Sequence, residues 1–162
     1  MSASDIVTEL IRRRLTIAVA ESLTGGLLIA ELIGVPGASA VVSGGVVAYN
    51  TSLKHSLLGV DAALLASRGA VDPDVAAAMA DGVRLACAID GVPASVGVST
   101  TGVAGPDPQD GKPVGTVFVG ISTDAGTRVF DLTLGGSRNV LRRRVVSESL
   151  VQLRKVLTET ET

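Results

Sequence analysis

One stretch of the sequence decides the fold class, and it reads Thr16-Ile17-Ala18-Val19-Ala20-Glu21-Ser22-Leu23-Thr24-Gly25-Gly26. Residues 16–20 form an apolar run of the kind that builds a buried strand, and a polar, glycine-rich turn follows directly. The apolar pattern of residues 27–32 then predicts a helix that ends at Gly34, with Pro36 just beyond it. A strand that passes through a tight turn into a helix is the basic unit of α/β proteins.

The segments on either side extend this alternation of strands and helices. We expect further helices over residues 5–14, 50–58, 61–68 and 72–88, and further strands over residues 46–49 and 94–99. A glycine-rich loop, residues 100–111, precedes an antiparallel hairpin of residues 114–123 and 128–134, and Gly135-Gly136-Ser137 opens a final helix. This order predicts an α/β fold: a three-layer α-β-α sandwich with a mixed, mostly parallel sheet and a C-terminal β-hairpin followed by a long helix.

Length and composition bound the class of protein. With 162 residues, the chain is expected to form a single domain over residues 1–162. Aromatic residues make up only 2% of the chain, which argues against a nucleic-acid platform of stacked rings, and the net charge of -2 argues against a duplex-binding surface. The most apolar stretch, residues 27–47, contains Glu31 and Pro36 and is not expected to span a membrane.

The scarcity of His and Cys narrows the chemistry further. One His and one Cys are too few for most zinc sites, so neither a metal nor another cofactor is expected. The single Cys87 precludes an intrachain disulfide, and with no secretory signal at the N-terminus this favours a cytoplasmic location. Cys87 continues the helical stripe of Val75, Met79 and Val83 and is expected to be a core residue.

Three polar or glycine-rich segments follow apolar strands, namely residues 21–26, 49–54 and 100–106. In open α/β sheets, ligands bind beyond the carboxyl ends of parallel strands. If the three strands run parallel, the three segments meet there and form the expected site. The third segment is not a Walker loop, because it lacks the Gly-Lys-Ser/Thr ending.

Ser22 and Lys54 are the candidate nucleophile and base of this site. Ser22 lies at a strand-to-helix turn, where the N–H groups of residues 23–26 can face an oxyanion or a phosphate. His55 is a poor base because no nearby acid would orient it, whereas a lysine in an apolar pocket loses its proton readily and serves as base in Ser-Lys hydrolases. The alternative interpretation makes Ser22 an ordinary turn residue and Tyr49 an amphipathic strand end.

Arg138 is the candidate anion-binding residue, because it lies in the first turn of the final helix beside free backbone N–H groups. The alternative is a solvated helix face, and solvation is the expected role of the charged run 142–144.

Together these segments resemble the CinA C-terminal domain family, whose enzymes are nicotinamide-nucleotide amidases. The resemblance covers nearly the whole chain in the expected order, and it is carried by residues 20–26 (AESLTGG), 49–54 (YNTSLK), 57–60 (LLGV), 69–71 (GAV), 101–106 (TGVAGP) and 112–117 (KPVGTV).

The resemblance implies a CinA C-terminal-like amidase domain that hydrolyses nicotinamide mononucleotide to nicotinic acid mononucleotide and ammonia in pyridine nucleotide salvage, without a metal. The family's catalytic residues correspond to Ser22, Tyr49 and Lys54. Ser22 is expected to attack the amide carbon, and Lys54, kept neutral, to take its proton directly or through Tyr49. The other expected substrate contacts are the N–H groups of Leu23, Thr24, Gly25 and Gly26 for the oxyanion, and Thr101, Gly102, Ala104, Gly105 and Arg138 for ribose and phosphate.

The resemblance also concerns partners. Relatives form homo-oligomers, so a homo-oligomer is expected, with the nucleotide as small-molecule partner and neither nucleic acid nor membrane. Two positions depart from the family's pattern: Leu23 stands where relatives usually have Cys, and residues 107–110 read Asp-Pro-Gln-Asp where relatives are usually glycine-rich. Two alternative functions are a nucleotide-binding module without turnover and a competence- or damage-linked partner protein.

Overall fold

A five-stranded sheet forms the centre of the molecule, with the strand order β2-β1-β3-β4-β5. The computed structural model describes residues 2–159 of the chain. Strands β1 (Ile17–Glu21), β2 (Val42–Val47) and β3 (Val96–Gly102) pair in parallel, whereas β4 (Thr116–Thr123) runs antiparallel to both β3 and β5 (Gly126–Thr133). All strands except β4 therefore point the same way, which confirms the mixed, mostly parallel sheet.

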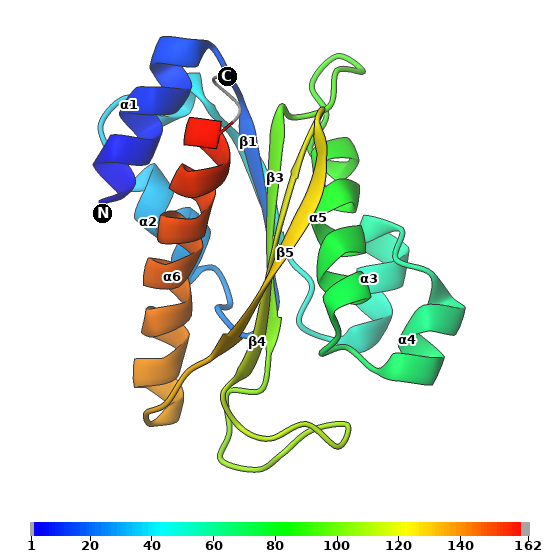
Figure 1. The fold of residues 1–162 in the computed structure, drawn as a ribbon. Helices are drawn as coiled ribbons and strands as arrows, with labels where there is room; N and C mark the ends of the chain where they lie inside the picture. The colour runs from blue at the N-terminus through cyan, green and yellow to red at the C-terminus, as the bar shows by residue number, and fades with distance from the viewer. Residues whose placement is uncertain (1, 160–162) are drawn as a thin grey trace.

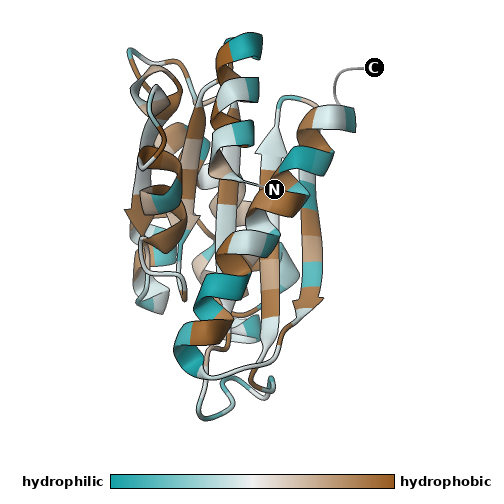
Figure 2. Ribbon diagram, turned by 90° about the vertical axis from the view of Figure 1, so that its left-hand side faces the viewer, coloured by the Kyte–Doolittle hydropathy of each residue, from teal (hydrophilic) through white to brown (hydrophobic). Residues whose placement is uncertain are grey.

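Helices cover both faces of this sheet (Figure 1). One layer holds α1 (Ala3–Arg13), α2 (Leu27–Ile33) and α6 (Arg138–Glu159), and the other holds α3 (Thr51–Leu58), α4 (Ala62–Arg68) and α5 (Pro73–Ala86). Figure 2 looks onto the first layer and shows hydrophobic and hydrophilic residues alternating in bands along its helices, the pattern of amphipathic helices that bury one side. The three-layer α-β-α sandwich with its long C-terminal helix is confirmed. No helix among residues 2–159 combines the length and the apolar character needed to cross a bilayer.

The sheet presents small residues to α5, and this brings the helix backbone against the strands. A Cβ built on Gly97 of β3 would lie 2.1 Å from the Ala80 carbonyl oxygen, and one on Gly120 of β4 would lie 2.5 Å from the Ala76 carbonyl oxygen. Between them, the Ser99 hydroxyl donates a hydrogen bond to the Ala76 oxygen at 2.6 Å. The opposite face of β3 and β4 carries larger aliphatic side chains such as Val98, Val119 and Ile121, because successive residues of a strand point to opposite faces.

The helix starts follow the capping signals of the sequence. The side chains of Asn50, Asp61 and Asp72 cap α3, α4 and α5, each accepting the backbone N–H two residues further on. Gly59 ends α3 in the left-handed conformation, with φ of 70°. The helices expected to begin around residues 50, 61 and 72 are thus confirmed, and α5 ends at Ala86, two residues before its expected end.

The beginning of β2 differs from the prediction. The strand begins at Val42 and contains Gly44 and Gly45, which were expected to precede it, whereas Ala48 and Tyr49 lie beyond its end. Parallel pairing with β1 runs through both glycines. Pairing with a neighbouring strand thus overrides the weak strand preference of glycine, which no local pattern reveals.

Two further boundaries also differ from the prediction. Strand β3 continues to Gly102, so Thr100 and Thr101 belong to a strand and not to the expected loop. Residues 126 and 127 pair with β4, which leaves a two-residue hairpin turn at 124–125. In both places the hydrogen bonds of a neighbouring strand extend the element beyond its apolar run.

Candidate active site

The three polar segments meet beyond the carboxyl ends of β1, β2 and β3. The Ser22 N–H donates to the Thr100 carbonyl at 3.0 Å, and the Ala48 N–H donates to the Glu21 carbonyl at 2.9 Å. The residues that follow β1 are therefore held between those of its two parallel neighbours. This is the edge of the sheet at which α/β proteins place their ligands.

Lys54 reaches the Ser22 hydroxyl from α3. Its Nζ lies 3.1 Å from Ser22 Oγ. The same nitrogen donates to the carbonyl oxygen of Ala48 at 2.7 Å and to that of Tyr49 at 3.4 Å. Because Asn50 starts α3 directly after Tyr49, Lys54 stands in the first turns of the helix, and helical side chains lean back toward the N-terminus. The lysine therefore returns to the segment that precedes its own helix.

Burial governs the charge of Lys54. The Lys54 side chain is 0% exposed and Ser22 is 8% exposed. Desolvation disfavours the ammonium form and lowers the pKa of Lys54 to about 8. An amine with such a pKa is neutral in a useful fraction of molecules near neutral pH, as a general base requires.

The buried carboxylate of Glu21 fixes the turn that joins β1 to α2. Glu21 is 1% exposed, and its carboxylate accepts the N–H of Leu28 at 2.8 Å and that of Ile29 at 3.1 Å. The turn passes through Gly25 and Gly26 with φ of 58° and 101°, a conformation that favours glycine. The positive end of α2 is thus occupied by the protein's own acid and is not available to a substrate anion.

Arg142 of α6 contacts the same turn from its other side. Its Nε donates to the Leu23 carbonyl at 2.7 Å, and its Nη2 donates to the Thr24 carbonyl at 3.3 Å. The Thr24 side chain is buried beneath the turn, with its Oγ1 2.8 Å from Thr100 Oγ1. Solvation was the expected role of Arg142, and this expectation is wrong because the guanidinium is a structural hydrogen-bond donor.

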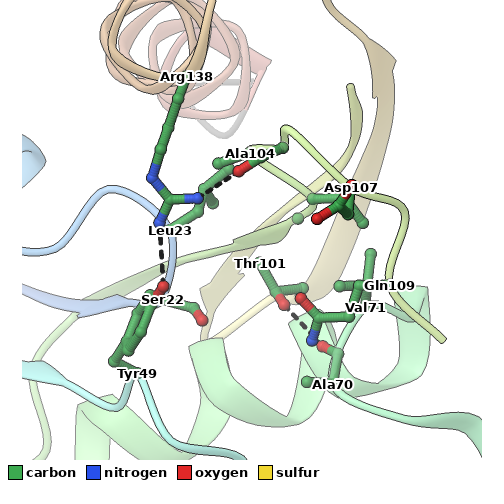
Figure 3. Close-up of a pocket in the computed structure, with 13 residues that line it drawn as sticks. Ser22, Leu23, Tyr49, Ala70, Val71, Thr101, Ala104, Asp107, Gln109 and Arg138 are labelled. Atoms are coloured by element: carbon green, nitrogen blue, oxygen red, sulfur yellow. Dashed lines mark hydrogen bonds between the residues drawn. The ribbon is translucent and has the colours of Figure 1, made fainter. Parts of the chain in front are cut away.

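A cavity of about 170 Å³ opens beside Ser22 (Figure 3). Arg138 lies above Ser22 and Tyr49, whereas Asp107 and Gln109 lie across the cavity. The cavity therefore combines a hydroxyl, a cation and a carboxylate. Its lining residues are Ser22, Leu23, Tyr49, Ala70, Val71, Thr101, Gly102, Val103, Ala104, Gly105, Asp107, Gln109 and Arg138.

Tyr49 and Arg138 form one wall of this cavity. Arg138 Nη2 donates to the Tyr49 hydroxyl at 3.0 Å, and Arg138 Nη1 donates to the Gly105 carbonyl at 2.5 Å. One guanidinium thereby joins α6, the loop after β2 and the loop after β3. Tyr49 is 60% exposed, so its ring borders solvent as well as the cavity.

The structure brings together most of the expected site residues but not all of them. Lys54 lies behind Ser22, and the expected lining residues outside the turn are all present in the wall. Within the turn only Ser22 and Leu23 line the cavity, whereas Thr24, Gly25 and Gly26 lie outside it because the chain leads away into α2. The Gly25 N–H is moreover bonded to the Ser22 carbonyl at 3.1 Å.

Sequence reasoning missed Ala70, Val71, Asp107 and Gln109 as lining residues. Ala70 is held at the cavity by the Thr101 hydroxyl, which donates to its carbonyl at 2.6 Å across a long sequence separation. Glu21 was also missed as the residue that anchors α2. An acid directly after a buried strand was the available signal.

The remaining candidates lie apart from the cavity. His55 Nδ1 is 2.8 Å from the Val60 carbonyl oxygen at the end of α3, in an exposed position, as expected for a helix residue without a catalytic role. Cys87 follows the last turn of α5 and is only partly buried, so it borders the core instead of filling it. Among residues 2–159, no group of three or more His, Cys, Asp or Glu side chains is arranged to hold a metal ion.

Fold and site together define an α/β sandwich protein with a buried serine–lysine pair at the carboxyl edge of its parallel strands. The sequence matches the CinA C-terminal domain over residues 1–157. The chain belongs to the CinA family.

Relatives support this assignment. A CinA-like protein of Frankia casuarinae is 49% identical over 148 residues, which cover 91% of this chain and 33% of the relative. A protein of Geobacillus sp. described as a putative competence-damage inducible protein is 50% identical over 133 residues, or 82% of this chain and 31% of the relative. The chain thus spans about a third of the length of these curated relatives.

Solved structures share the fold. The competence/damage inducible protein CihA from Agrobacterium tumefaciens superposes with a TM-score of 0.87 at 33% identity, covering 96% of this chain and 93% of that chain. A CinA superfamily protein from Klebsiella pneumoniae gives a TM-score of 0.90 at 26% identity, covering 97% of this chain and 96% of that chain.

Proposed function

We propose that this protein is a serine amidohydrolase that deamidates nicotinamide mononucleotide to nicotinic acid mononucleotide and ammonia. The observation that carries the proposal is the 3.1 Å contact between Lys54 Nζ and Ser22 Oγ, with both side chains buried beside a cavity. A serine is a weak nucleophile until an adjacent base takes its proton, and Lys54 fills that role. The family resemblance supports the choice of substrate, and with it a proposed role in pyridine nucleotide salvage.

The surroundings of Lys54 favour direct proton transfer from Ser22. A neutral amine has two N–H groups and one lone pair, and the carbonyls of Ala48 and Tyr49 accept the two N–H groups. The lone pair then faces the remaining neighbour, which is the Ser22 hydroxyl. Because Lys54 contacts Ser22 directly, the proton needs no relay through the Tyr49 hydroxyl, which accepts a hydrogen bond from Arg138.

The reaction proceeds in two halves. Ser22 Oγ attacks the carboxamide carbon while Lys54 takes the hydroxyl proton, and the tetrahedral intermediate collapses as Lys54 returns that proton to the leaving ammonia. A water molecule then attacks the nicotinoyl ester on Ser22 and gives a proton to Lys54. Lys54 passes this proton back to Ser22 Oγ as the ester bond breaks, and the carboxylic acid that forms leaves and loses its remaining proton to solvent water.

The oxyanion is assigned to the Leu23 N–H by elimination among the nearby amides. The N–H groups of Ser22 and Gly25 are bonded within the protein, and those at the start of α2 are bonded to Glu21. The N–H groups of Leu23, Thr24 and Gly26 donate to no other group of residues 2–159, and of these three residues only Leu23 lines the cavity. The residue after a nucleophilic serine often fills this role, and one such donor contributes roughly 3–4 kcal/mol.

The rest of the cavity suits the nucleotide portion of the substrate. The Arg138 guanidinium supplies a positive charge for the phosphate. Thr101 and Gly102 at the end of β3, and Ala104 and Gly105 in the loop after it, face the ribose, together with the Asp107 carboxylate on the far side. The sparse aromatic content leaves the pyridine ring to aliphatic walls such as Leu23 and Val71.

Ammonia release from nicotinamide mononucleotide tests the proposed function. The wild type is expected to turn over, and Ser22→Ala is expected to lose turnover while keeping its fold by circular dichroism. Ser56→Ala is the matched control, because Ser56 is an exposed serine on α3. No ammonia release by the wild type at micromolar enzyme overturns the proposal.

A second candidate is a competence- or damage-linked protein partner, which the names of the relatives favour. That function predicts a protein captured specifically in pull-downs, equal capture by Ser22→Ala, and no rise of the melting temperature with the nucleotide. Tight nucleotide binding by calorimetry without turnover would identify a binding module instead.

A further inference from the structure

Arg142 is tied to the turn that follows Ser22, and we infer that it is a positioning residue for the proposed reaction. By holding the carbonyl groups of Leu23 and Thr24, it keeps the oxyanion-binding peptide in place beside the nucleophile. The inference rests on the proposed function and adds to it a residue that lies outside the cavity wall.

The contact is a two-pronged clamp. Arg142 Nε and Nη2 donate to two consecutive carbonyls, at 2.7 Å for Leu23 and 3.3 Å for Thr24. A planar guanidinium can make both bonds at once, which an ammonium on a flexible stem does poorly. The fit is close, because a Cβ on Gly25 would lie 3.2 Å from Arg142 Nη2.

Peptide planarity carries the effect of this clamp to the oxyanion donor. In a trans peptide the C=O and N–H point in opposite directions. With the Thr24 carbonyl turned toward Arg142, the Gly25 N–H points back into the turn, where it donates to the Ser22 carbonyl at 3.1 Å. That bond fixes the Ser22–Leu23 peptide and therefore the direction of the Leu23 N–H.

Other contacts hold α2 and α6 without Arg142. Glu21 anchors the start of α2, and the core side of α6 buries Leu141, Val145 and Leu150 between 0% and 3% exposed. Arg142 does not line the cavity, so it is not expected to contact the substrate. Its loss should therefore loosen the turn and lower kcat, with little change in KM.

The experiment compares Arg142→Ala with Arg143→Ala, because Arg143 is an exposed arginine next to it on α6. With nicotinamide mononucleotide we expect kcat of Arg142→Ala to fall roughly 10- to 100-fold, somewhat less than complete loss of an oxyanion donor costs. KM should stay within about twofold, and low millimolar guanidinium should restore part of kcat in Arg142→Ala only, by refilling the vacated position. Arg142→Lys, which keeps the charge but not the fork, should show a smaller loss.

A second readout does not depend on the substrate. The rate at which a fluorophosphonate labels Ser22, followed by intact mass, should fall in Arg142→Ala in parallel with kcat, because the phosphoryl oxygen uses the same oxyanion site. Failure of the wild type to release ammonia while still being labelled would sink the assigned substrate but leave Arg142 testable by labelling.

Three results overturn the inference. The first is a kcat and labelling rate of Arg142→Ala equal to those of the wild type. The second is a rise in KM at unchanged kcat. The third is a loss of kcat that guanidinium does not restore and that is accompanied by a lower melting temperature. If Arg142→Ala does not fold, Arg142→Lys decides by the same criteria.

Discussion

The Tyr49 hydroxyl accepts a hydrogen bond from Arg138 at 3.0 Å, while the Tyr49 backbone carbonyl is the group that contacts Lys54. The backbone and the side chain of Tyr49 therefore have different roles in the site. Its carbonyl helps to orient the lysine, and its side chain joins the cation of the cavity wall to the loop after β2. A substitution of the side chain leaves the first role intact.

Tyr49→Phe is expected to impair binding more than chemistry. The variant loses one hydrogen bond to Arg138, which is worth about 0.5–1.5 kcal/mol and corresponds to a rise in KM of roughly 2- to 10-fold. The pH dependence of the rate should keep its midpoint, because Lys54 and its carbonyl partners are unchanged. Steady-state kinetics across pH measure both quantities. A loss of kcat above about 100-fold at unchanged KM would instead make the hydroxyl a proton relay.

The rate should depend on pH through Lys54. Because the neutral amine is the reactive form, kcat/KM is expected to rise with pH and to level off above about 8, the value to which burial lowers the pKa of Lys54. Lys54→Met should abolish turnover at every pH. Profiles of the wild type and of Lys155→Met, a control on α6 away from the site, would show the midpoint. A profile that is flat between pH 6 and 9.5 would remove Lys54 from the mechanism.

Stability should also depend on pH through the same lysine. Burial lowers the folded-state pKa of Lys54 from 10.5 to about 8, so between these values the unfolded chain binds a proton that the folded chain lacks. The free energy of unfolding of the wild type, relative to Lys54→Met, should therefore rise by about 2–3 kcal/mol from pH 7.5 to 10. Urea unfolding of both proteins at each pH measures it. If the difference in free energy of unfolding between the wild type and Lys54→Met did not change with pH, Lys54 would have an ordinary pKa in the folded protein.

Arg138→Gln should weaken binding of the phosphate. A charge-assisted contact is worth about 1.5–3 kcal/mol, so KM for nicotinamide mononucleotide should rise roughly 10- to 100-fold. The rise should be absent with nicotinamide riboside, which lacks the phosphate, and Arg143→Gln should change neither value. If Arg138→Gln raised KM equally for both substrates, Arg138 would not bind the phosphate and would only help to form the cavity wall.

Glu21→Gln should destabilise the protein. A glutamine offers one carbonyl to the two N–H groups of Leu28 and Ile29 and places its own N–H₂ against one of them. The free energy of unfolding is expected to fall by about 1–3 kcal/mol. Chemical denaturation measures the loss, with Glu31→Gln, an exposed position on α2, as the control. Equal stability of the two variants would contradict the anchoring role of Glu21.

The parts of the fold that could be predicted are those set by interactions between residues close together in the sequence. Asn50, Asp61 and Asp72 cap their own helices within two residues, so the start of each helix is readable along the chain. The true extents of β2 and β3 were not readable, because strands across the sheet supply the hydrogen bonds that set them. The β4–β5 hairpin is a further example, because residues 126 and 127 pair with β4 and the turn is therefore shorter than expected.

The same distinction between local and long-range interactions separates the site residues that could be predicted from those that could not. Ser22, Tyr49 and Lys54 stand in segments that the family resemblance singles out, and the strand order brings them to one edge. Arg142 could not be recognised, because its partners are carbonyl groups of the turn after β1, more than a hundred residues away in the chain. Every residue type has a backbone carbonyl, so the sequence does not reveal which carbonyl accepts a hydrogen bond.

The close approach of α5 to the sheet constrains how this scaffold can change. At Gly97 and Gly120 even a methyl group would collide with the helix backbone, and at Gly82 of α5 it would lie 1.8 Å from the Leu58 carbonyl oxygen. Neither natural variation nor directed evolution can easily place larger side chains at these three positions. The segment around Asp107 and Gln109 is freer to change substrate preference, because its side chains border the cavity and are exposed to solvent.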